Sequence, residues 1–278
     1  MKIAIQGEIG SNSHMAAQAM LCDAPEPVEI VACNVSAEVM EKVVAGAVDG
    51  AVLPIENSLH GSVAEHYDLL LEQPVRIERE SLLRIRHNLI AMPGVKLAEI
   101  RQVISHPVAL SQCRRFLGSH TELAVMPFYD TAGSVKHLMH LGLRDVAGVA
   151  PVLAAEKYGA EVLVAGIEDH TENYTRFHLI RRDGPGGKLQ QGLVNKMSIA
   201  FAIEHHAGTL VAALELLARA GIDLTKIESR PVPGSPWEYV FYVDIRFRDL
   251  GEAELVTGSL RAHCRMVKVL GRYAAAII

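Results

Sequence analysis

A hydroxyl and a guanidinium are neighbours at Thr175 and Arg176, and this pair is the clearest chemical signal in the sequence. Arginine presents a planar fork of N–H donors that fits a carboxylate, and a threonine hydroxyl can donate or accept one proton. The apolar run 177–180 predicts a strand, and the polar, acidic segment 168–173 before it predicts a loop. A rigid strand could hold both groups in a cleft, but for these residues alone an exposed arginine on an ordinary strand is the more frequent case.

Three further loops share one feature, because each ends a predicted strand and leads into a predicted helix through small or polar residues. These loops lie at 10–11, 57–58 and 131–134. The first N–H groups of a helix have no partner within it, so small residues there let an anion approach. Such loops meet at the carboxyl ends of the strands of an open α/β sheet. Together with Thr175 and Arg176, these loops are consistent with a cleft for a small carboxylated ligand. Three ordinary capped helices explain them about equally well.

Composition narrows the class of protein. The chain has 278 residues, which suits two domains, and half of them are hydrophobic. The net charge of -5 and the lack of a basic run argue against a nucleic-acid-binding protein. No signal segment or membrane-spanning apolar stretch is evident, so we expect a cytoplasmic protein. The scattered cysteines form no CxxC and predict reduced core thiols; they are Cys22, Cys33, Cys113 and Cys264.

Strand and helix patterns alternate along the first part of the chain and predict an α/β fold with parallel strand pairs. We predict strands at 3–6, 28–32, 50–55, 103–107, 146–149 and 162–164, and helices at 13–20, 37–45, 62–71, 109–117, 134–141 and 152–158. The segment 183–188 is the best linker. After it, strands at 196–203, 222–229, 239–246 and 267–271 and helices at 208–220 and 250–266 follow a βαββαβ order. That order suits a ferredoxin-like sandwich, with 267–271 as an edge strand.

Other familiar motifs are missing. The turn at 7–10 reads GxxG rather than GxGxxG, and no Walker P-loop occurs. His137 and His140 could share a helix face, but no HExxH or carboxylate with metal-ligand spacing accompanies them. We therefore expect no metal site and interpret the two histidines as a surface pair.

Seven segments, taken in order, carry a resemblance to a known family. They are 7–14, 54–58, 105–107, 129–134, 173–177, 227–231 and 270–273. Together they resemble prephenate dehydratase in its monofunctional form with a C-terminal ACT regulatory domain. The combination of Thr-Arg-Phe at 175–177 with Glu-Ser-Arg-Pro at 228–231 is specific to that family. No helical mutase segment precedes Met1, so we expect no fused chorismate mutase.

The resemblance implies a domain layout. A catalytic domain over 1–183 would have two α/β lobes like those of a type-II periplasmic binding protein, with the substrate between them. We place the lobes at about 1–78 and 79–165, with the hinge and return strand at 166–183. A ferredoxin-like ACT domain would follow over 195–278.

The resemblance also implies the conversion of prephenate to phenylpyruvate, with loss of water and CO2 and without a cofactor, in L-phenylalanine biosynthesis. Hydroxide leaves poorly, so a proton donor is needed, and Thr175 matches the family's candidate donor. Arg176 and free N–H groups near Asn57, Ser58 and Thr131 would hold the pyruvyl carboxylate. The departing carboxylate should lie in a drier place, since a tight ion pair would stabilise the ground state. The other residues expected at the substrate are Ser11, Glu56, Ala132, Ser134, Asn173 and Phe177.

A second site is expected for an amino-acid effector, L-phenylalanine. Its residues would be Ala207, Gly208, Thr209, Leu210, Glu228, Ser229, Arg230 and Pro231. Free N–H groups at the start of the helix could take the carboxylate of the amino acid, and Glu228 could face its ammonium. The family usually has Pro-Gly-Ala-Leu where this chain has Ala-Gly-Thr-Leu, which leaves the strength and sign of regulation open. Exposed sheet edges over 195–275 predict a homodimer or homotetramer.

Two alternatives stay open. Arogenate differs from prephenate by an amino group, so an arogenate dehydratase fits the same residues. A non-catalytic sensor of amino acids or keto acids could use the same cleft, although the presence of both Thr175 and Arg176 argues against it. The ultimate source of the proton is also left open by the sequence.

Overall fold

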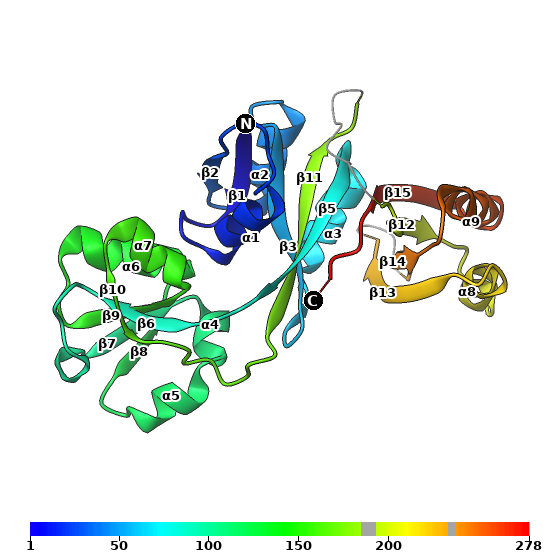
Figure 1. Cartoon of the computed structure of the whole chain (residues 1–278). Helices are drawn as coiled ribbons and strands as arrows, with labels where there is room; N and C mark the ends of the chain where they lie inside the picture. The colour runs from blue at the N-terminus through cyan, green and yellow to red at the C-terminus, as the bar shows by residue number, and fades with distance from the viewer. Residues whose placement is uncertain (185–192, 233–236, 278) are drawn as a thin grey trace. The chain divides into compact units, whose positions relative to one another are not determined.

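The computed structural model describes residues 1–184, 193–232 and 237–277 and divides into two compact units. Unit 1 comprises Met1–Ser62 with Ser81–Phe177, and unit 2 comprises Val63–Glu80 with His178–Ile278. Two long strands, β5 (Val75–Arg84) and β11 (Tyr174–Arg182), have residues in both units (Figure 1). No helix in the described part of the chain is long and apolar enough to cross a membrane.

The first half of unit 1 is built on parallel strands. Central strand β1 (Lys2–Gln6) pairs with β2 (Glu29–Cys33) and β3 (Gly50–Asn57), and helices α1 (Asn12–Met20) and α2 (Ser36–Val44) connect them. The short strand β4 (Gly61–Ser62) pairs antiparallel with β3. Consecutive apolar residues are fully buried in both β1 (Ile3 to Ile5) and β3 (Ala51 to Leu53). Burial of neighbouring residues is expected for a sheet that is covered on both faces.

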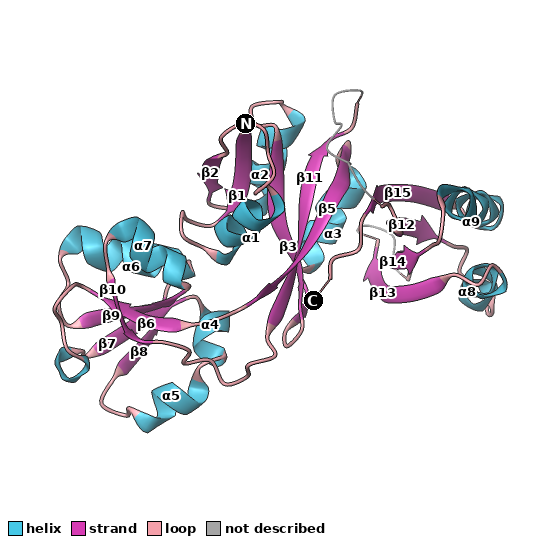
Figure 2. Ribbon diagram, viewed as in Figure 1, coloured by secondary structure: helices cyan, strands magenta, loops and turns pink. Residues whose placement is uncertain are grey.

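The second half of unit 1 is a five-stranded sheet in the order β10-β6-β9-β7-β8. The strands are β6 (Asn88–Ala91), β7 (Gln102–Ser105), β8 (Ala124–Pro127), β9 (Val146–Ala150) and β10 (Glu161–Val164). On one face, Leu89 and Ala91 pack in a cluster with residues of α4 (Pro107–Ser111) and α5 (Arg114–Ser119). On the other, Ile90 packs with residues of α6 (Thr131–Leu141) and α7 (Val152–Tyr158). Figure 2 shows these two helices next to the sheet. A short 3-10 helix covers Leu97–Glu99.

The single helix predicted at 109–117 is wrong, because the chain forms α4 and α5 with a break at Gln112 and Cys113. The carboxylate of Asp169 accepts hydrogen bonds from the backbone N–H groups of Arg114 and Arg115, at 3.0 and 2.9 Å. A carboxylate at this place satisfies the first donors of a new helix and therefore starts α5 independently. The acid lies far along the chain, so local sequence patterns could not reveal the break.

Unit 2 contains α3 (Ala64–Glu72) and a four-stranded antiparallel sheet in the order β13-β14-β12-β15. The strands are β12 (Lys196–Ala202), β13 (Asp223–Pro231), β14 (Tyr239–Arg246) and β15 (Met266–Tyr273), and the helices are α8 (Thr209–Arg219) and α9 (Leu250–His263). Both helices pack on one face, over residues such as Met197, Ile199 and Val243. The predicted βαββαβ, ferredoxin-like arrangement is confirmed. Of the predicted linker, residues 185–188 lie outside the described part.

The expectation that 267–271 forms an edge strand is wrong. Strand β15 pairs with β12 on one side and with β5 on the other, where Gly271 lies opposite Ile77. A Cβ at Gly271 would collide with the backbone of Ile77. Glycine therefore permits this close approach of two strands.

The cysteines are all free, as predicted, but they are not all in the core. Cys33 and Cys113 are buried, Cys264 is partly buried, and Cys22 is exposed. Burial raises the pKa of Cys33 to about 11, so this thiol stays protonated and behaves as an apolar core group.

Candidate functional site

The Thr175 hydroxyl belongs to a cluster of neutral polar groups where β3 ends and β11 begins. The side-chain amide of Asn57 donates to Thr175 Oγ1 at 2.9 Å and to Asn173 Oδ1 at 2.8 Å. Thr175 is 9% exposed and Asn173 is 0% exposed. Because Thr175 Oγ1 already accepts a hydrogen bond, the hydroxyl proton points elsewhere and is available to an acceptor in a ligand.

The turn after Asn57 differs from the prediction, which placed 57–58 at the start of a helix. Asn57 Oδ1 accepts from the backbone N–H groups of Leu59 and His60, at 3.0 and 3.1 Å, and this capped turn leads into β4. Helix α3 begins only at Ala64. The N–H of Ser58 donates to the Tyr174 carbonyl at 2.8 Å, so it is not the free anion donor that we expected. Asparagine competes with a helix start by closing the turn with its own side chain.

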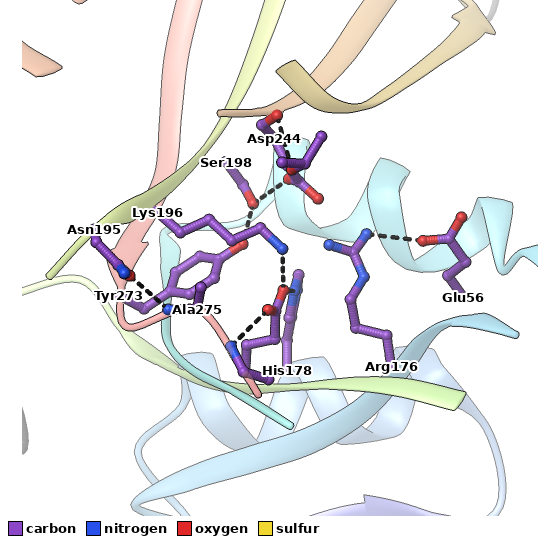
Figure 3. A network of polar contacts seen from close by, with 12 residues as sticks. Glu56, Arg176, His178, Asn195, Lys196, Ser198, Asp244, Tyr273 and Ala275 are labelled. Carbon is purple, nitrogen blue, oxygen red and sulfur yellow. Dashed lines mark hydrogen bonds and ion pairs between the residues drawn. The ribbon is translucent and has the colours of Figure 1, made fainter. Parts of the chain in front are cut away.

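Arg176 pairs with Glu56, the residue before Asn57. The guanidinium lies 3.2 Å from the Glu56 carboxylate, and the two side chains are 8% and 35% exposed (Figure 3). Consecutive side chains of a strand point to opposite faces, so Arg176 faces away from Thr175. The structure brings Thr175 together with Asn57 and Asn173, and it places Arg176 with Glu56 on the other side of β11. Phe177 is 1% exposed and is a core residue of β11.

The loop at Gly7–Ser11 contacts the starts of α6 and α7. A Cβ at Gly7 would lie 2.6 Å from Asp130 Oδ2, and one at Gly10 would lie 2.8 Å from Ala154 Cα. Both glycines also have a positive φ, +94° and +90°. Ser11 is 4% exposed and caps α1 by accepting from the N–H of His14 at 3.4 Å. Ser11 thus supports the loop from inside.

The start of α6 has a cap that the sequence motif did not single out. Asp130 Oδ1 accepts from the N–H of Gly133 at 2.7 Å, and burial raises the pKa of Asp130, although hydrogen bonds from Gly133 and Glu8 oppose that rise. Ala132 and Ser134 are fully buried, and Ser134 Oγ donates to the Thr131 carbonyl at 2.6 Å. Their side chains therefore hold the helix start in place rather than line a cleft.

Glu8 joins the first and second halves of unit 1, and sequence reasoning missed it. Lys136 Nζ lies 2.9 and 3.1 Å from the two Glu8 oxygens, and Tyr129 Oη donates to Glu8 Oε1 at 2.8 Å. Tyr158 Oη donates to the Ile9 carbonyl at 2.8 Å. The segments 7–11 and 129–134 thus meet, as expected for the loops at 10–11 and 131–134, whereas the third loop of that prediction, at 57–58, pairs with Tyr174. The charged residue inside the GxxG turn was the signal that could have drawn attention to this contact.

A cavity of about 230 Å³ lies in unit 2 at the N-terminal end of α8. Gly208 precedes the helix with φ +90°, and Gly208, Thr209 and Leu210 line the cavity. The exposed Ala207 lies beside them in the same loop. The rest of the lining is Ile203, Glu204, His205, His206, Val211, Trp237, Glu238, Tyr239 and Phe241. The aromatic side of the cavity was not anticipated, because its residues lie on a different segment with no motif of its own.

The second predicted effector segment, Glu228–Pro231, does not line this cavity. Arg230 forms two hydrogen bonds with Asp68 of α3, at 3.3 and 2.7 Å, and Glu228 lies 3.6 Å from Lys226. Alternate residues of β13 point to the face of the sheet away from α8 and α9. Within one chain, the two predicted effector segments are therefore not brought together.

A buried polar network that includes the charged side chains of Glu80 and Lys196 lies on the face of the sheet away from α8 and α9. Glu80 lies 2.7 Å from Lys196 and 3.7 Å from His178, with side chains 2%, 8% and 1% exposed. Figure 3 shows Lys196 and His178 close together. Burial opposes ionisation of Glu80, but hydrogen bonds and charges from His178 and Lys196 outweigh it and hold the Glu80 pKa well below its usual range. Nearby, Ser198 Oγ donates to Asp244 Oδ1 at 2.5 Å and contacts the Tyr273 hydroxyl at 2.5 Å.

The sequence and the fold of this chain are similar to those of several known proteins. The sequence profile described as "Prephenate dehydratase" matches residues 3–185. "Arogenate dehydratase/prephenate dehydratase 2, chloroplastic" of Arabidopsis thaliana is 37% identical over 98% of this chain and 72% of its own length. The structure of prephenate dehydratase in complex with L-Phe from Arthrobacter aurescens aligns with a TM-score of 0.86 at 29% identity, over 99% of this chain and 90% of that one. A structure described as GqqA, a novel type of quorum quenching acylase, aligns with a TM-score of 0.86 at 31% identity, over 99% and 98%.

Proposed function

Because this chain belongs to the prephenate dehydratase family, we propose that it converts prephenate to phenylpyruvate in L-phenylalanine biosynthesis. In this reaction the bond from the ring to the hydroxyl group and the bond from the ring to the carboxylate both break. The carboxylate leaves as CO2, its bonding electrons complete the aromatic ring, and the hydroxyl leaves as water after taking up a proton. A group that delivers a proton to the departing oxygen is the main chemical need.

The observation that carries the proposal is the environment of Thr175. Its oxygen accepts from the Asn57 amide at 2.9 Å, which directs the hydroxyl proton away from Asn57 and makes it available to the substrate. Donation into the oxygen also stabilises the developing alkoxide. A positioned donor of this kind can contribute about 10²–10⁴-fold to the rate.

Asn173 offers a second donor at the same place. Its side chain is fully buried, and its Nδ2 has no hydrogen-bond partner among the described residues. A buried donor without a partner costs about 1–3 kcal/mol, and an oxygen of the substrate would relieve that cost. We assign Asn173, with Asn57 and Thr175, to the substrate-binding face. To Ser11, Ser58 and Thr131 we assign a supporting role: Ser11 caps α1, the Ser58 N–H bonds the Tyr174 carbonyl, and Thr131 begins α6.

For Arg176 and Glu56 we propose a supporting role. Their ion pair ties β11 to β3, which hold Thr175 and Asn57 respectively. A substrate carboxylate at Arg176 would lie on the opposite face of β11 from the hydroxyl of Thr175. The geometry therefore favours Arg176 as a positioning residue over a direct ligand.

An acylase role, as in the description of the 31%-identical structure, is the less favoured reading of Thr175. A threonine nucleophile needs an adjacent base to take its proton. The partner of Thr175 Oγ1 is the amide nitrogen of Asn57, which donates and cannot accept a proton. The contact suits a hydroxyl that gives up its proton to a ligand.

For the cavity in unit 2 we propose L-phenylalanine as the occupant. The N–H groups at the start of α8 suit the carboxylate, and Glu204 or Glu238 suits the ammonium. Trp237, Tyr239 and Phe241 offer aromatic surface for the ring. The L-Phe named with the Arthrobacter aurescens structure supports this assignment. Isothermal calorimetry with L-phenylalanine tests it, and no heat of binding at millimolar concentration would exclude phenylalanine as the ligand.

Two further points complete the proposal. We propose a homodimer or homotetramer held by the ferredoxin-like part, to be tested by light scattering with and without L-phenylalanine. We propose a cytoplasmic enzyme, in keeping with four free cysteines, to be tested by cell fractionation.

One experiment separates the candidate functions. Purified protein is incubated separately with prephenate and with arogenate, and the products are identified by mass spectrometry. Phenylpyruvate from prephenate supports the proposal, and preferential formation of phenylalanine from arogenate would replace it with arogenate dehydratase. If neither compound turns over although both bind in calorimetry, the chain is a sensor and the proposal is wrong.

A further inference from the structure

A chain of hydrogen bonds leads from the core of the second half of unit 1 to the turn that holds Asn57. His87 Nε2 lies 2.7 Å from Gln112 Oε1, and Gln112 Nε2 lies 3.0 Å from His60 Nδ1. His60 donates its backbone N–H to Asn57 Oδ1 at 3.1 Å, and Asn57 Nδ2 donates to Thr175 Oγ1 at 2.9 Å. All five residues belong to unit 1.

The direction of this chain follows from Ser111. Its hydroxyl donates to the Val108 carbonyl at 2.7 Å, so toward His60 Nε2, 3.2 Å away, Ser111 Oγ can only accept. His60 Nε2 therefore has the proton, and in the neutral ring His60 Nδ1 is an acceptor. Gln112 must present its amide nitrogen to His60 and its oxygen to His87.

His87 lies at the end of the hydrogen-bond chain farthest from Thr175, and it can hold the side-chain amide of Gln112 in one orientation. It is 2% exposed, and burial lowers its pKa, although Gln112 and Glu168 oppose that change. The ring is therefore neutral, and the Gln112 oxygen requires its single proton on Nε2. His87 Nδ1 has no hydrogen-bond partner among the described residues, as expected for the unprotonated nitrogen. The backbone N–H of His87 donates to Glu168 at 2.9 Å, which holds the residue in place.

We propose that His87 is a positioning residue for Thr175, acting through Gln112 and His60. The Nε2–H of His87 sets the orientation of the Gln112 amide, which pins His60 and with it the turn after Asn57. Asn57 then keeps its oxygen toward the turn and its nitrogen toward Thr175, so that the hydroxyl proton of Thr175 faces the substrate. This inference rests on the proposed dehydratase function for its kinetic part.

The kinetic test compares His87→Leu, which removes the donor, with His87→Gln, whose amide nitrogen can take the place of Nε2–H. We expect His87→Leu to lower kcat roughly tenfold with KM nearly unchanged, because a misplaced catalytic group loses rate before binding. His87→Gln should recover most of the lost rate. His120→Leu removes a histidine of the same half of unit 1 whose ring, within the described part of the chain, bonds to Ser119 and Phe116 beside it, and it should leave kcat unchanged.

A second measurement does not depend on turnover. In protein labelled with 15N-histidine, the ring nitrogens of His87 and His60 should each show the tautomer protonated at Nε2, with signals assigned through the variants. In His87→Leu the 15N signal of His60 Nδ1 should move, because the Gln112 amide that faces it is no longer held by His87, whereas His120→Leu should leave it unchanged.

The outcomes are distinguishable. If the parent turns over neither prephenate nor arogenate, the proposed function fails, and the tautomers alone decide on the hydrogen-bond chain. If His60 has its proton on Nδ1, or does not respond to His87→Leu, the chain is refuted. Equal losses of kcat in His87→Leu and His87→Gln, in step with equal losses of melting temperature, would mean that His87 serves stability only.

Discussion

The polar groups around Thr175 and those around Glu80 each include a residue of β11, but the two groups differ in charge. The Thr175 cluster contains only amides and hydroxyls, and one of its donors, Asn173 Nδ2, lacks a partner among the described residues. The Glu80 network contains a carboxylate and an ammonium 2.7 Å apart, both almost fully buried. A neutral cluster can aim a proton without stabilising a charged ground state, whereas the Glu80 carboxylate is held by Lys196 at 2.7 Å and by the backbone N–H of Ala276 at 3.0 Å. The contrast predicts that the first cluster controls rate and the second controls stability.

The largest effect is expected at Thr175. Thr175→Ala removes the proton donor and should lower kcat by about 10²–10⁴-fold, with the melting temperature nearly unchanged. Thr175→Ser keeps the hydroxyl and should retain part of the activity. Steady-state kinetics with thermal melts check both, and turnover by Thr175→Ala within a few-fold of the parent would remove this residue from the mechanism.

Disruption of the Glu80 network should lower the stability of the fold and leave kcat nearly unchanged. Lys196→Met leaves the Glu80 carboxylate buried without its nearest cation and should cost about 3–5 kcal/mol of stability. The kcat of the molecules that remain folded should change little. Urea unfolding measures the first quantity and active-site-normalised kinetics the second; a large loss of kcat without loss of stability would reverse the assignment of roles.

The same network predicts a dependence of stability on acid. The pKa of Glu80 is lowered in the folded protein relative to a usual value of 4.5, so below that value the unfolded state binds the extra proton first. The stabilisation by Glu80 is therefore complete above about pH 4.5 and is lost as the pH falls toward its folded pKa. Melting temperatures from pH 7 to pH 3 should fall more steeply for the parent than for Glu80→Gln, and parallel curves would contradict this.

Arg176→Lys should have the smallest effect and sharpens the comparison. If Arg176 supports β11 through Glu56, KM should change less than about threefold while stability falls by about 0.5–1.5 kcal/mol, because a lysine keeps the charge but loses the fork of donors. A KM raised tenfold or more at unchanged stability would instead make Arg176 a direct ligand of the substrate carboxylate.

Local patterns in the sequence predicted most of the strands and helices, and they drew attention to Thr175, whose role stays a prediction. Prediction from the sequence failed where the side of a strand to which a residue points determines the site that it joins. Thr175 and Arg176 are neighbours in the chain but point to opposite sides of β11, and Glu228 points away from the α8 cavity for the same reason. It also failed where a distant side chain intervenes, as Asp169 does between α4 and α5. A motif identifies which residues matter more readily than which of them share a space.

The hydrogen bond from Ser58 N–H to the Tyr174 carbonyl has a consequence for chemical ageing. Asparagine followed by a small residue such as serine is prone to deamidation, in which the next backbone nitrogen attacks the side-chain carbonyl carbon. Here that nitrogen is engaged at 2.8 Å, and Asn57 Oδ1 is held by two backbone donors. Conversion of Asn57 to aspartate would replace the nitrogen that donates to Thr175 by an oxygen that cannot. The hydrogen bond between Ser58 and Tyr174 at the start of β11 therefore also protects Asn57 from deamidation.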